Sequence, residues 1–384
     1  MNIAYFTNPH AIHCFKWINY FSKHNNVIIF CEKSLSGVTS PFSHPQNLTI
    51  YPILPDTYPL RNFLFRFSTT RKIKTLLKKH GTELTHSMYV VSYAFWAHHA
   101  KAPNHIITTR GSDILVEYKK LLEPAITSRE KRMKEYFKKL FRVTFEKARF
   151  ITSTSNKQKM VVESIIPSSG KQCVIRTGVD VDYFLSISNR IRIDVKKEQL
   201  IIFSPRSMKP LYNIDIIIDA VFKFNEQNTN RQALLHIIDD YPETNYSEYI
   251  RKKIRSQKSN YCVILDKQNQ EQMIALYKNS DIVVMIPSSD GTPVSGVEAM
   301  LSKIPLILGN LEYDADLFNE NTVWKINNFS SADLCDKIAE VIHSADKQLK
   351  LNAAYNTALS NADMRRELKK VEALYHSAIN VAIN

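Results

Sequence analysis

The sequence predicts an α/β protein with two domains, each built on a doubly wound parallel sheet. A chain of 384 residues is too long for one ordinary hydrophobic core and suits about two domains of ~150–200 residues. In both halves, short apolar runs typical of buried strands alternate with segments whose apolar residues recur at helical spacing. The polar stretch from Arg190 to Gln199 interrupts this alternation, and we interpret it as the domain boundary.

The N-terminal half opens on a strand, a helix and a second strand. Asn2–Thr7 and Asn26–Cys31 are apolar runs, and residues 11–24 between them carry apolar side chains at helical spacing. The other strands expected in this half are Asn47–Leu54, Glu83–Val90, His105–Thr109, Phe150–Ser153 and Cys173–Thr177, and the other helices are Leu60–His80, Lys131–Ala148 and Asn156–Ile165.

The C-terminal half repeats the alternation, beginning with the strand LIIFS at Leu200–Ser204. The last segment, Met364–Asn384, is expected to be a helix that crosses back to the first domain, so the predicted bounds are 1–185, 195–363 and 364–384 for that helix. The other strands expected here are Ala233–Ile238, Val263–Leu265, Asp281–Ile286 and Pro305–Leu308, and the helices are Ile214–Asn225, Tyr246–Gln257, Gln270–Asn279, Val294–Leu301 and Ser331–Ser344.

The composition is that of a soluble, cytoplasmic protein. Hydrophobic residues make up 44% and charged residues 23%, which fits a globular fold. The five cysteines are scattered and form no CxxC, which suits a reducing compartment and offers no zinc spacing. The N-terminus, MNIAYFTNPH, has neither a basic nor an apolar signal region, and no apolar run approaches the ~18 residues of a membrane span.

The net charge of +14 is concentrated in one half of the chain. Residues 1–180 carry 27 Lys and Arg against 11 acidic residues, a net +16, whereas the remainder is at −2. Residues 58–80 hold seven Lys and Arg and no acid, interleaved with Phe63, Phe65 and Phe67; residues 135–150 are similar but include Glu135 and Glu146. Three interpretations remain: solvated helix faces, docking onto an anionic membrane, or RNA binding, for which we find no recognised motif.

The segment SSDGTPVSGVEAM, residues 288–300, follows the strand DIVVMI and opens the next helix. Ligands of doubly wound sheets bind beyond the carboxyl ends of the strands. Pro293 suits the first helical position, and the free N–H groups there suit a phosphate. Gly291 and Gly296 are two of only eight glycines, and we expect them to let a ligand approach the backbone. Asp290 and Glu298 can accept hydroxyl donors on either side, which describes a nucleotide-sugar; alternatively, Asp290 caps the helix and Glu298 is solvated.

This segment resembles the E-x7-E signature of retaining glycosyltransferase family 4, with Asp290 in the place of the first acid and Glu298 in that of the second. The resemblance implies the GT-B fold: two Rossmann-like domains facing a central cleft, the first binding the acceptor and the second the nucleotide-sugar. Other segments that occur in the family's order are VIRTGVDVDYF (174–184), SPRSMKPLYNIDIIIDAV (204–221), NSDIVVMIPSS (279–289) and IPLILGN (304–310).

The resemblance also assigns roles to residues of the C-terminal half. Arg206 and Lys209 would clamp the donor diphosphate, which is chemically sound because cations neutralise a leaving group that gains charge. Glu298 would hold the ribose hydroxyls and Asp290 the hydroxyls of the transferred sugar. The amides of Thr292, Val294 and Ser295 would face the diphosphate, and the loop at Asp266 would lie near the base. The complete set of donor-binding residues expected besides the four charged ones is Gly291, Thr292, Pro293, Val294, Ser295 and Asp266.

The N-terminal half departs from the family pattern. The family's first loop is usually glycine-rich, whereas this chain has His10 and His13 there, and each of them could equally be a cap or packing residue. The family often has His-Gly-x-Asp at another strand end, where this chain has Arg110 in TTRGSD. An arginine there can contact a phosphate or a sugar but is no base at neutral pH. The residues expected to line the site in this domain are His10, His86, Arg110, Gly111 and Asp113.

The chemistry that the resemblance implies retains the anomeric configuration, with front-face attack assisted by the departing phosphate and no protein nucleophile. Two Asp-x-Asp matches exist, Asp180/Asp182 and Asp314/Asp316, but so short a match is common by chance, and we predict no metal and no cofactor.

The function predicted is transfer of a sugar from a nucleotide-sugar to a glycan acceptor, which we expect to be lipid-linked. The setting predicted is bacterial surface polysaccharide biosynthesis (O-antigen of lipopolysaccharide, capsule or exopolysaccharide). The place expected is the cytoplasmic face of the inner membrane, as a peripheral protein, with no nucleic-acid partner. The alternatives are a nucleotide-sugar-binding module that has lost turnover and a GT-B-like epimerase or phosphorylase, for which we see neither the acid/base constellation nor a pyridoxal-bearing lysine.

Overall fold

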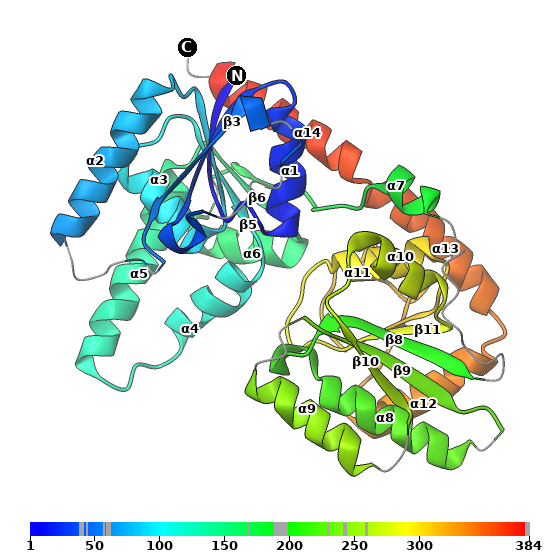
Figure 1. The fold of residues 1–384 in the computed structure, drawn as a ribbon. Coiled ribbons are helices and arrows are strands. Elements are labelled where there is room, and N and C mark those ends of the chain that lie inside the picture. The colour runs from blue at the N-terminus through cyan, green and yellow to red at the C-terminus, as the bar shows by residue number, and fades with distance from the viewer. Residues whose placement is uncertain are drawn as a thin grey trace. The chain divides into compact units, whose positions relative to one another are not determined.

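The computed structural model describes residues 1–37, 42–43, 45–56, 58, 63–167, 169–187, 199–228, 230–240, 244–257 and 260–380 (Figure 1). The chain divides into two compact units. The first unit is Met1–Thr177 with Glu367–Asn384, and the second unit is Gly178–Arg366.

The first unit contains a seven-stranded sheet in the order β3-β2-β1-β4-β5-β6-β7, and all its neighbouring strands are parallel. Because the strands are parallel, their carboxyl ends meet at one edge of the sheet. The strands are β1 (Asn2–Phe6), β2 (Asn26–Glu32), β3 (Leu48–Leu54), β4 (Leu84–Met88), β5 (His105–Thr109), β6 (Phe150–Ser153) and β7 (Gln172–Val174).

Helices cover both faces of this sheet. Ala4 and Phe6 of β1 pack with Ile73 and Leu77 of α2, whereas the alternating Tyr5 meets Tyr375 of α14 on the opposite face. The helices of the unit are α1 (Ile12–Ser22), α2 (Phe63–Lys79), α3 (Phe95–His99), α4 (Lys119–Leu122), α5 (Ser128–Lys147), α6 (Asn156–Ile165) and α14 (Met364–Asn380), with π-helical turns at Val90–Ala94 and Ser112–Tyr118 and 3₁₀ turns at Lys33–Leu35 and Pro45–Asn47.

The second unit contains a six-stranded parallel sheet in the order β10-β9-β8-β11-β12-β13. Figure 1 shows α8, α9 and α12 on one face of this sheet and α10 and α11 on the other, in agreement with its two separate apolar cores. The strands are β8 (Leu200–Ser207), β9 (Ala233–Asp239), β10 (Cys262–Asp266), β11 (Ile282–Met285), β12 (Leu306–Leu308) and β13 (Trp324–Lys325). The helices are α7 (Val181–Ser186), α8 (Ile214–Gln227), α9 (Asn245–Ser256), α10 (Gln270–Lys278), α11 (Val294–Leu301), α12 (Ser331–His343) and α13 (Lys347–Asn361), with a 3₁₀ turn at Pro210–Tyr212.

The prediction of two doubly wound parallel sheets is confirmed, with differences in detail. The chain passes from the first unit to the second at Thr177 and Gly178, earlier than the expected boundary, because Val181 and Phe184 pack in the core of the second unit. Residues 190–198 of the polar stretch predicted as the boundary lie outside the described residues, as do residues 60–62 of the predicted Leu60–His80 helix.

Four helices, α3, α4, α7 and α13, and the two-residue strand β13 were not predicted. α3 and α4 have only five and four residues. α7 has only six residues, and α13 combines small and polar residues without a broad apolar stripe. Within the part of the chain that the structure describes, no helix combines the length and the apolar character needed to cross a membrane.

Candidate functional site

Arg206 lies near the carboxyl end of β8, directly beside the strand that leads into the SSDGTPVSGVEAM segment. β8 pairs in parallel with β11, so the residues that follow the two strands emerge at the same edge of the sheet. The Arg206 guanidinium donates from Nη2 to Asp290 Oδ2 at 3.1 Å and from Nη1 to Ser295 Oγ at 3.3 Å. The structure therefore brings together three residues that the sequence predicted as donor ligands.

The Arg206–Asp290 pair is mostly sheltered from water, with side-chain exposures of 18% and 16%. The guanidinium also stacks over the ring of Tyr212, with its central carbon 4.2 Å from the ring centre. Burial is the largest influence and would lower the pKa of Arg206, but the Asp290 carboxylate acts together with Tyr212 and Tyr277, and the pKa is raised. Arg206 is thus a fixed cation whose direction is set by Asp290 and Tyr212.

The helix that follows, α11, begins without a capping side chain. Pro293 occupies the N-cap position, one residue earlier than predicted, and the first turn carries no acid. Asp290 does not cap the helix; its Oδ1 instead accepts from the amide of Gly291 at 2.8 Å. The first N–H groups of α11 and its dipole therefore offer partial positive charge close to Arg206, which is an arrangement suited to an anion.

Glu298 lies in the second turn of α11, beside Tyr277 of α10. Tyr277 is fully buried, and its pKa is raised well above the usual value by burial and then by the Glu298 carboxylate. Tyr313, in the loop after β12, has a buried hydroxyl without a hydrogen-bond partner among the described residues. Burial and the charge of Asp290 raise its pKa. Two tyrosine hydroxyls thus border the charged cluster in addition to the predicted residues.

The role expected for Gly296 is wrong. A Cβ at this position would lie 2.9 Å from the ring of Phe318 and 3.3 Å from the Met285 methyl group, so the glycine permits close packing of α11 inside the unit. It does not open a surface to a ligand, because position 296 is buried on the core side of the helix.

The loop after β8 is tied to the segment after β11 by one hydrogen bond from the Asn213 side chain and one between backbone groups. Asn213, which has a left-handed backbone (φ 50°), donates to the carbonyl of Ile286 at 2.7 Å, and the amide of Ser288 donates to the carbonyl of Leu211 at 2.8 Å. Lys209 lies half-buried on this same loop, three residues beyond Arg206. These contacts hold the two predicted elements in register with each other.

Two further donor-site residues occupy less central positions. Asp266 ends β10, at the far edge of the sheet from β11, and is exposed. The Thr292 hydroxyl donates to Asp314 Oδ2 at 2.8 Å, so the Thr292 side chain is anchored to the loop after β12.

In the first unit, Arg110 lies just beyond the end of β5 and stacks over the Trp17 ring, with its central carbon 4.8 Å from the ring centre. Its Nη1 donates to Thr177 Oγ1 at 3.1 Å and its Nη2 to Met88 Sδ at 3.6 Å, while its buried Nε has no partner in the described part of the chain. Burial lowers the pKa of Arg110, and nearby acidic groups only partly offset this. A largely desolvated cation is therefore held at this sheet edge by weak partners.

Asp113 is fully buried, and its carboxylate is used by the backbone. It accepts hydrogen bonds of 3.0–3.1 Å from the amides of Val90, Arg110, Gly111 and Ile114. Gly111 has φ +112°, which only glycine adopts without strain. Burial raises the pKa of Asp113 to about 6 although the amides oppose this shift. Asp113 and Gly111 thus shape the loop that carries Arg110.

The histidines predicted as candidates differ in their surroundings. His86 is fully buried, with Nδ1 2.6 Å from the Tyr375 hydroxyl and Nε2 2.6 Å from Thr108 Oγ1, so both ring nitrogens are occupied. His10 is half-buried in the loop before α1, and its amide donates to Asn8 Oδ1 at 2.9 Å. Burial, followed by repulsion from Arg110, lowers the pKa of the neighbouring His13 to about 3.

The Asp-x-Asp matches make contacts within the second unit. Asp180 accepts from the amide of Tyr183 as the cap of α7, and both Asp180 and Asp182 face Arg365. Among the described residues, no group of three or more His, Cys, Asp or Glu side chains is placed to hold a metal ion.

Sequence reasoning missed the aromatic residues around both arginines. These are Trp17, Tyr212, Tyr277 and Tyr313. Tyr212 alone offered a signal, because it lies within the predicted Arg/Lys element; the other three have the spacing of ordinary core residues.

Two family profiles match the chain. The profile described as "Glycosyl transferases group 1" matches residues 187–357, and the profile described as "Glycosyl transferase 4-like" matches residues 2–155. The first match contains the cluster around Arg206 and the second contains Arg110. A search by sequence among curated proteins found no significant match.

Solved structures of similar fold span nearly the whole chain. A glycosyltransferase from Rickettsia africae is 17% identical with a TM-score of 0.75, covering 98% of each chain. The sucrose-phosphate synthase of Thermosynechococcus elongatus is 13% identical with a TM-score of 0.77, covering 99% of this chain and 100% of its own. Anabaena HepE, solved with UDP-glucose, is 15% identical with a TM-score of 0.74, covering 98% and 100%.

Proposed function

We propose that this chain, which is a glycosyltransferase with the GT-B fold, transfers a sugar from a nucleotide-sugar to a glycan acceptor with retention of configuration and without a metal ion. The observation that carries the proposal is the cluster at the carboxyl edge of the second sheet. It joins the Arg206 cation, the uncapped start of α11 and the two acids Asp290 and Glu298. The structure of HepE with UDP-glucose supports a nucleotide-sugar as the donor class.

The cluster suits a diphosphate leaving group. As the bond from the anomeric carbon to the phosphate breaks, negative charge grows on the phosphate oxygens. The Arg206 guanidinium and the first amides of α11 are already fixed where they can stabilise that charge. The acceptor hydroxyl attacks the same face of the sugar and gives its proton to the departing phosphate, so no protein side chain has to act as nucleophile or base.

The Arg206–Asp290 pair implies two roles for Asp290: it orients Arg206 before the donor binds and contacts the donor sugar afterwards. A diphosphate that binds Arg206 competes with the Asp290 carboxylate for the same guanidinium. We propose that donor binding releases Asp290 from Arg206, so that its carboxylate turns to the sugar hydroxyls. Aspartate is one methylene shorter than glutamate. The Asp290 carboxylate therefore reaches less far toward the sugar than the glutamate that the family usually has as its first acid.

The test is a panel of nucleotide-sugars, read first as thermal stabilisation and then as release of nucleotide. A donor that binds the folded protein raises its melting temperature by mass action. Glu298→Gln should lower turnover about 10²-fold while the fold survives. The matched control is Glu340→Gln, on the exposed side of α12, which should keep the rate of the unchanged protein.

Two alternatives predict other results. A binding module without turnover, suggested by the departures at Asp290 and Arg110, would show nucleotide binding but no nucleotide release with any donor. An epimerase would convert one nucleotide-sugar into another without needing an acceptor.

We further propose that the acceptor is lipid-linked, as in bacterial surface polysaccharide synthesis, and that the first unit docks peripherally onto an anionic membrane. Helix α2 supports this. Its buried side carries Ile73 and Leu77, whereas Phe67 is 60% exposed. The side chains of Phe63 and Phe65 lie outside the described residues. The exposed cations of α2 are Arg71, Lys72, Lys74, Lys78 and Lys79.

Helix α5 differs from α2 because part of its charge is neutralised within the helix. Lys138 pairs with Glu135 at 2.9 Å, and Arg142 pairs with Glu146 at 2.8 Å. We therefore assign the electrostatic part of docking to α2 rather than to the part of α5 from Glu135 onward. Each cation near an anionic surface contributes about 1 kcal/mol. Replacing the five α2 cations by Gln should weaken vesicle binding more than about ten-fold, and unchanged binding would remove the docking proposal.

A further inference from the structure

The connection between α4 and α5 presents apolar side chains to the solvent. Ile126 is 94% exposed, Leu122 is 58% exposed and Met133 is 42% exposed. Single exposed apolar residues are common on protein surfaces, but these three lie within the twelve residues 122–133, at the end of α4, in the connection and in the first part of α5. We name residues 119–133 the α4–α5 hairpin.

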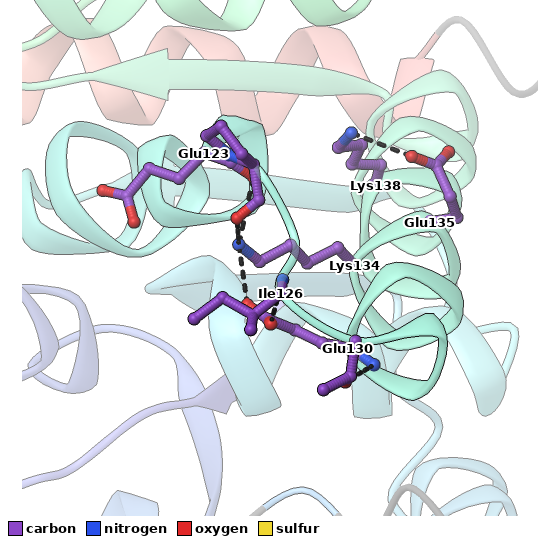
Figure 2. Close-up of polar contacts among 8 residues, drawn as sticks. Glu123, Ile126, Glu130, Lys134, Glu135 and Lys138 are labelled. Atoms are coloured by element: carbon purple, nitrogen blue, oxygen red, sulfur yellow. Dashed lines mark hydrogen bonds and ion pairs between the residues drawn. The ribbon is translucent and has the colours of Figure 1, made fainter.

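The hairpin is fixed in place by Lys134 and Glu130 (Figure 2). Lys134 is only 9% exposed, and its Nζ donates to the carbonyls of Glu123 at 3.0 Å and Pro124 at 3.3 Å. The same Nζ lies 3.0 Å from Glu130 Oε1, while Glu130 Oε2 accepts from the amide of Ile126 at 2.9 Å. One ion pair, buried on the Lys134 side and partly exposed on the Glu130 side, thus holds the backbone at Glu123, Pro124 and Ile126, and the Ile126 side chain is presented outward.

The hairpin that carries the apolar group also carries exposed cations. They are Lys119, Lys120, Arg129, Lys131 and Arg132. Of the two acids in the hairpin, Glu130 is paired with Lys134, so the surface around Ile126 is strongly positive. An apolar tip on a segment rich in cations is the arrangement expected of a segment that enters the headgroup region of an anionic bilayer.

The hairpin is continuous with the surface of α2. Arg66 of α2 donates to the Tyr136 hydroxyl of α5 at 2.6 Å, which ties the two helices together. Tyr136 and Phe67 are themselves 38% and 60% exposed. Amphipathic aromatic side chains such as tyrosine favour the interface between lipid and water.

We propose that the α4–α5 hairpin inserts into an anionic membrane, with Leu122, Ile126 and Met133 entering the acyl boundary while the cations of the hairpin hold lipid phosphates. The inference deepens the proposed membrane association and rests on it. A membrane fits better than RNA, because the exposed apolar side chains of the hairpin itself are aliphatic or thioether groups, on which bases do not stack; the exposed aromatics Tyr136 and Phe67 lie outside residues 119–133.

The decisive experiment is Ile126→Trp with fluorescence in the presence of phosphatidylglycerol vesicles. The chain's own tryptophans, Trp17, Trp96 and Trp324, are all buried, so they give a constant background. Insertion predicts a blue shift of the new emission and its quenching by brominated acyl chains. The matched control is Leu349→Trp, at a position that is 74% exposed on α13 of the second unit, which should show neither change.

A second pair of variants measures the contribution to binding. Ile126→Ser should weaken partition into these vesicles about ten-fold, which corresponds to the transfer of one aliphatic side chain. Leu349→Ser should leave partition unchanged. Both sites are exposed, so both variants should melt at the temperature of the unchanged protein.

The outcomes separate the two proposals. Vesicle binding without a shift in Ile126→Trp overturns insertion and leaves docking by α2 standing. A shift caused by polyuridylate RNA in place of vesicles also overturns it. No vesicle binding by the unchanged protein removes both membrane proposals, whereas failure to bind any nucleotide removes the proposed donor and leaves insertion untouched.

Discussion

Two arginines, one in each unit, occupy comparable places with opposite electrostatics. Arg206 and Arg110 each lie where a central strand of a parallel sheet ends, and each stacks on an aromatic ring, Tyr212 or Trp17. Arg206 has a carboxylate partner in Asp290 at 3.1 Å. Arg110 donates to a hydroxyl and a thioether, and it makes no ion pair with a carboxylate in the described part of the chain.

The difference shows what a partner does to a sheltered cation. Burial acts on both groups in the same direction. The pKa of Arg206 is raised because Asp290, together with Tyr212 and Tyr277, outweighs burial, whereas the groups near Arg110 do not and its pKa is lowered. Asp113 is close to Arg110, but its carboxylate oxygens accept hydrogen bonds from backbone amides. In the second unit, Asp290 therefore neutralises Arg206. In the first unit, the charge of Arg110 is only partly offset by nearby groups.

The largest effect should come from removing Arg206. We expect Arg206→Ala to lower turnover about 10²–10³-fold, because the leaving group loses a fixed cation. Arg231→Ala is the control, since Arg231 forms an exposed pair with Asp281 at 3.6 Å. Steady-state release of nucleotide measures both variants, and a rate close to that of the unchanged protein in Arg206→Ala would refute the site.

The second effect concerns pH, because buried histidines with a strongly lowered pKa lie in the first unit, whereas the second unit has the buried His236, whose pKa burial lowers. Burial, followed by nearby cations, lowers the pKa of His13 to about 3, and burial, followed by His98, lowers that of His105 to about 3. These groups stay neutral in the folded protein but take up protons in the unfolded chain below about pH 6.5. The first unit should therefore lose stability as the pH falls from 6.5, by about 1.4 kcal/mol per pH unit for each such histidine.

Asp113 acts in the opposite sense and offsets part of this loss. Its pKa of about 6 in the folded protein exceeds the unfolded value, so its contribution favours the fold at low pH and is lost as the pH rises through 6. Amide hydrogen exchange at pH 7 and pH 5, corrected for intrinsic rates, compares β5 with β11. Equal loss of protection in the two strands would contradict the expected difference.

The third effect separates the role of Asp113 from that of Arg110. Asp113→Asn should lower the free energy of unfolding by about 2 kcal/mol, because an amide group then faces backbone N–H donors. Denaturant unfolding at pH 8 measures this change, where Asp113 is ionised. A change below about 0.5 kcal/mol would show that the loop does not depend on the carboxylate.

The smallest effect is expected for Arg110→Met. Methionine keeps contact with the Trp17 ring and removes a sheltered charge that has no ion-pair partner among the described residues, so the free energy of unfolding should change by less than about 1 kcal/mol. Arg206→Met should cost more, because it leaves Asp290 sheltered without its cation. The same denaturant unfolding checks both, and equal losses would erase the distinction between the two arginines.

Much of the candidate site in the second unit follows from local sequence. The spacing of Asp290 and Glu298 and the helix predicted at Val294–Leu301 match the structure, because a strand, a turn and a helix follow one another along the chain. The packing role of Gly296 could not be predicted from the local sequence. It depends on Phe318, which reaches α11 from a later loop.

The candidates in the first unit were harder to assign, since their surroundings come from distant segments. His86 meets Tyr375, 289 residues away in the chain, and Asp113 meets the amide of Val90 from another strand end. A histidine or an aspartate at a strand end looks the same in the sequence whether its polar atoms are occupied or open.

By itself, the sequence determined the alternation of strands and helices, the acidic pair eight positions apart and the excess of positive charge in the first half, because these depend on periodicity and composition. The tertiary structure decided which charges meet. It paired Arg206 with Asp290, left Arg110 against Trp17, and turned Lys134 inward so that Ile126 faces outward. The physical reason is that attraction between charges and the loss of water around them act over a few ångströms in space, whatever the separation along the chain.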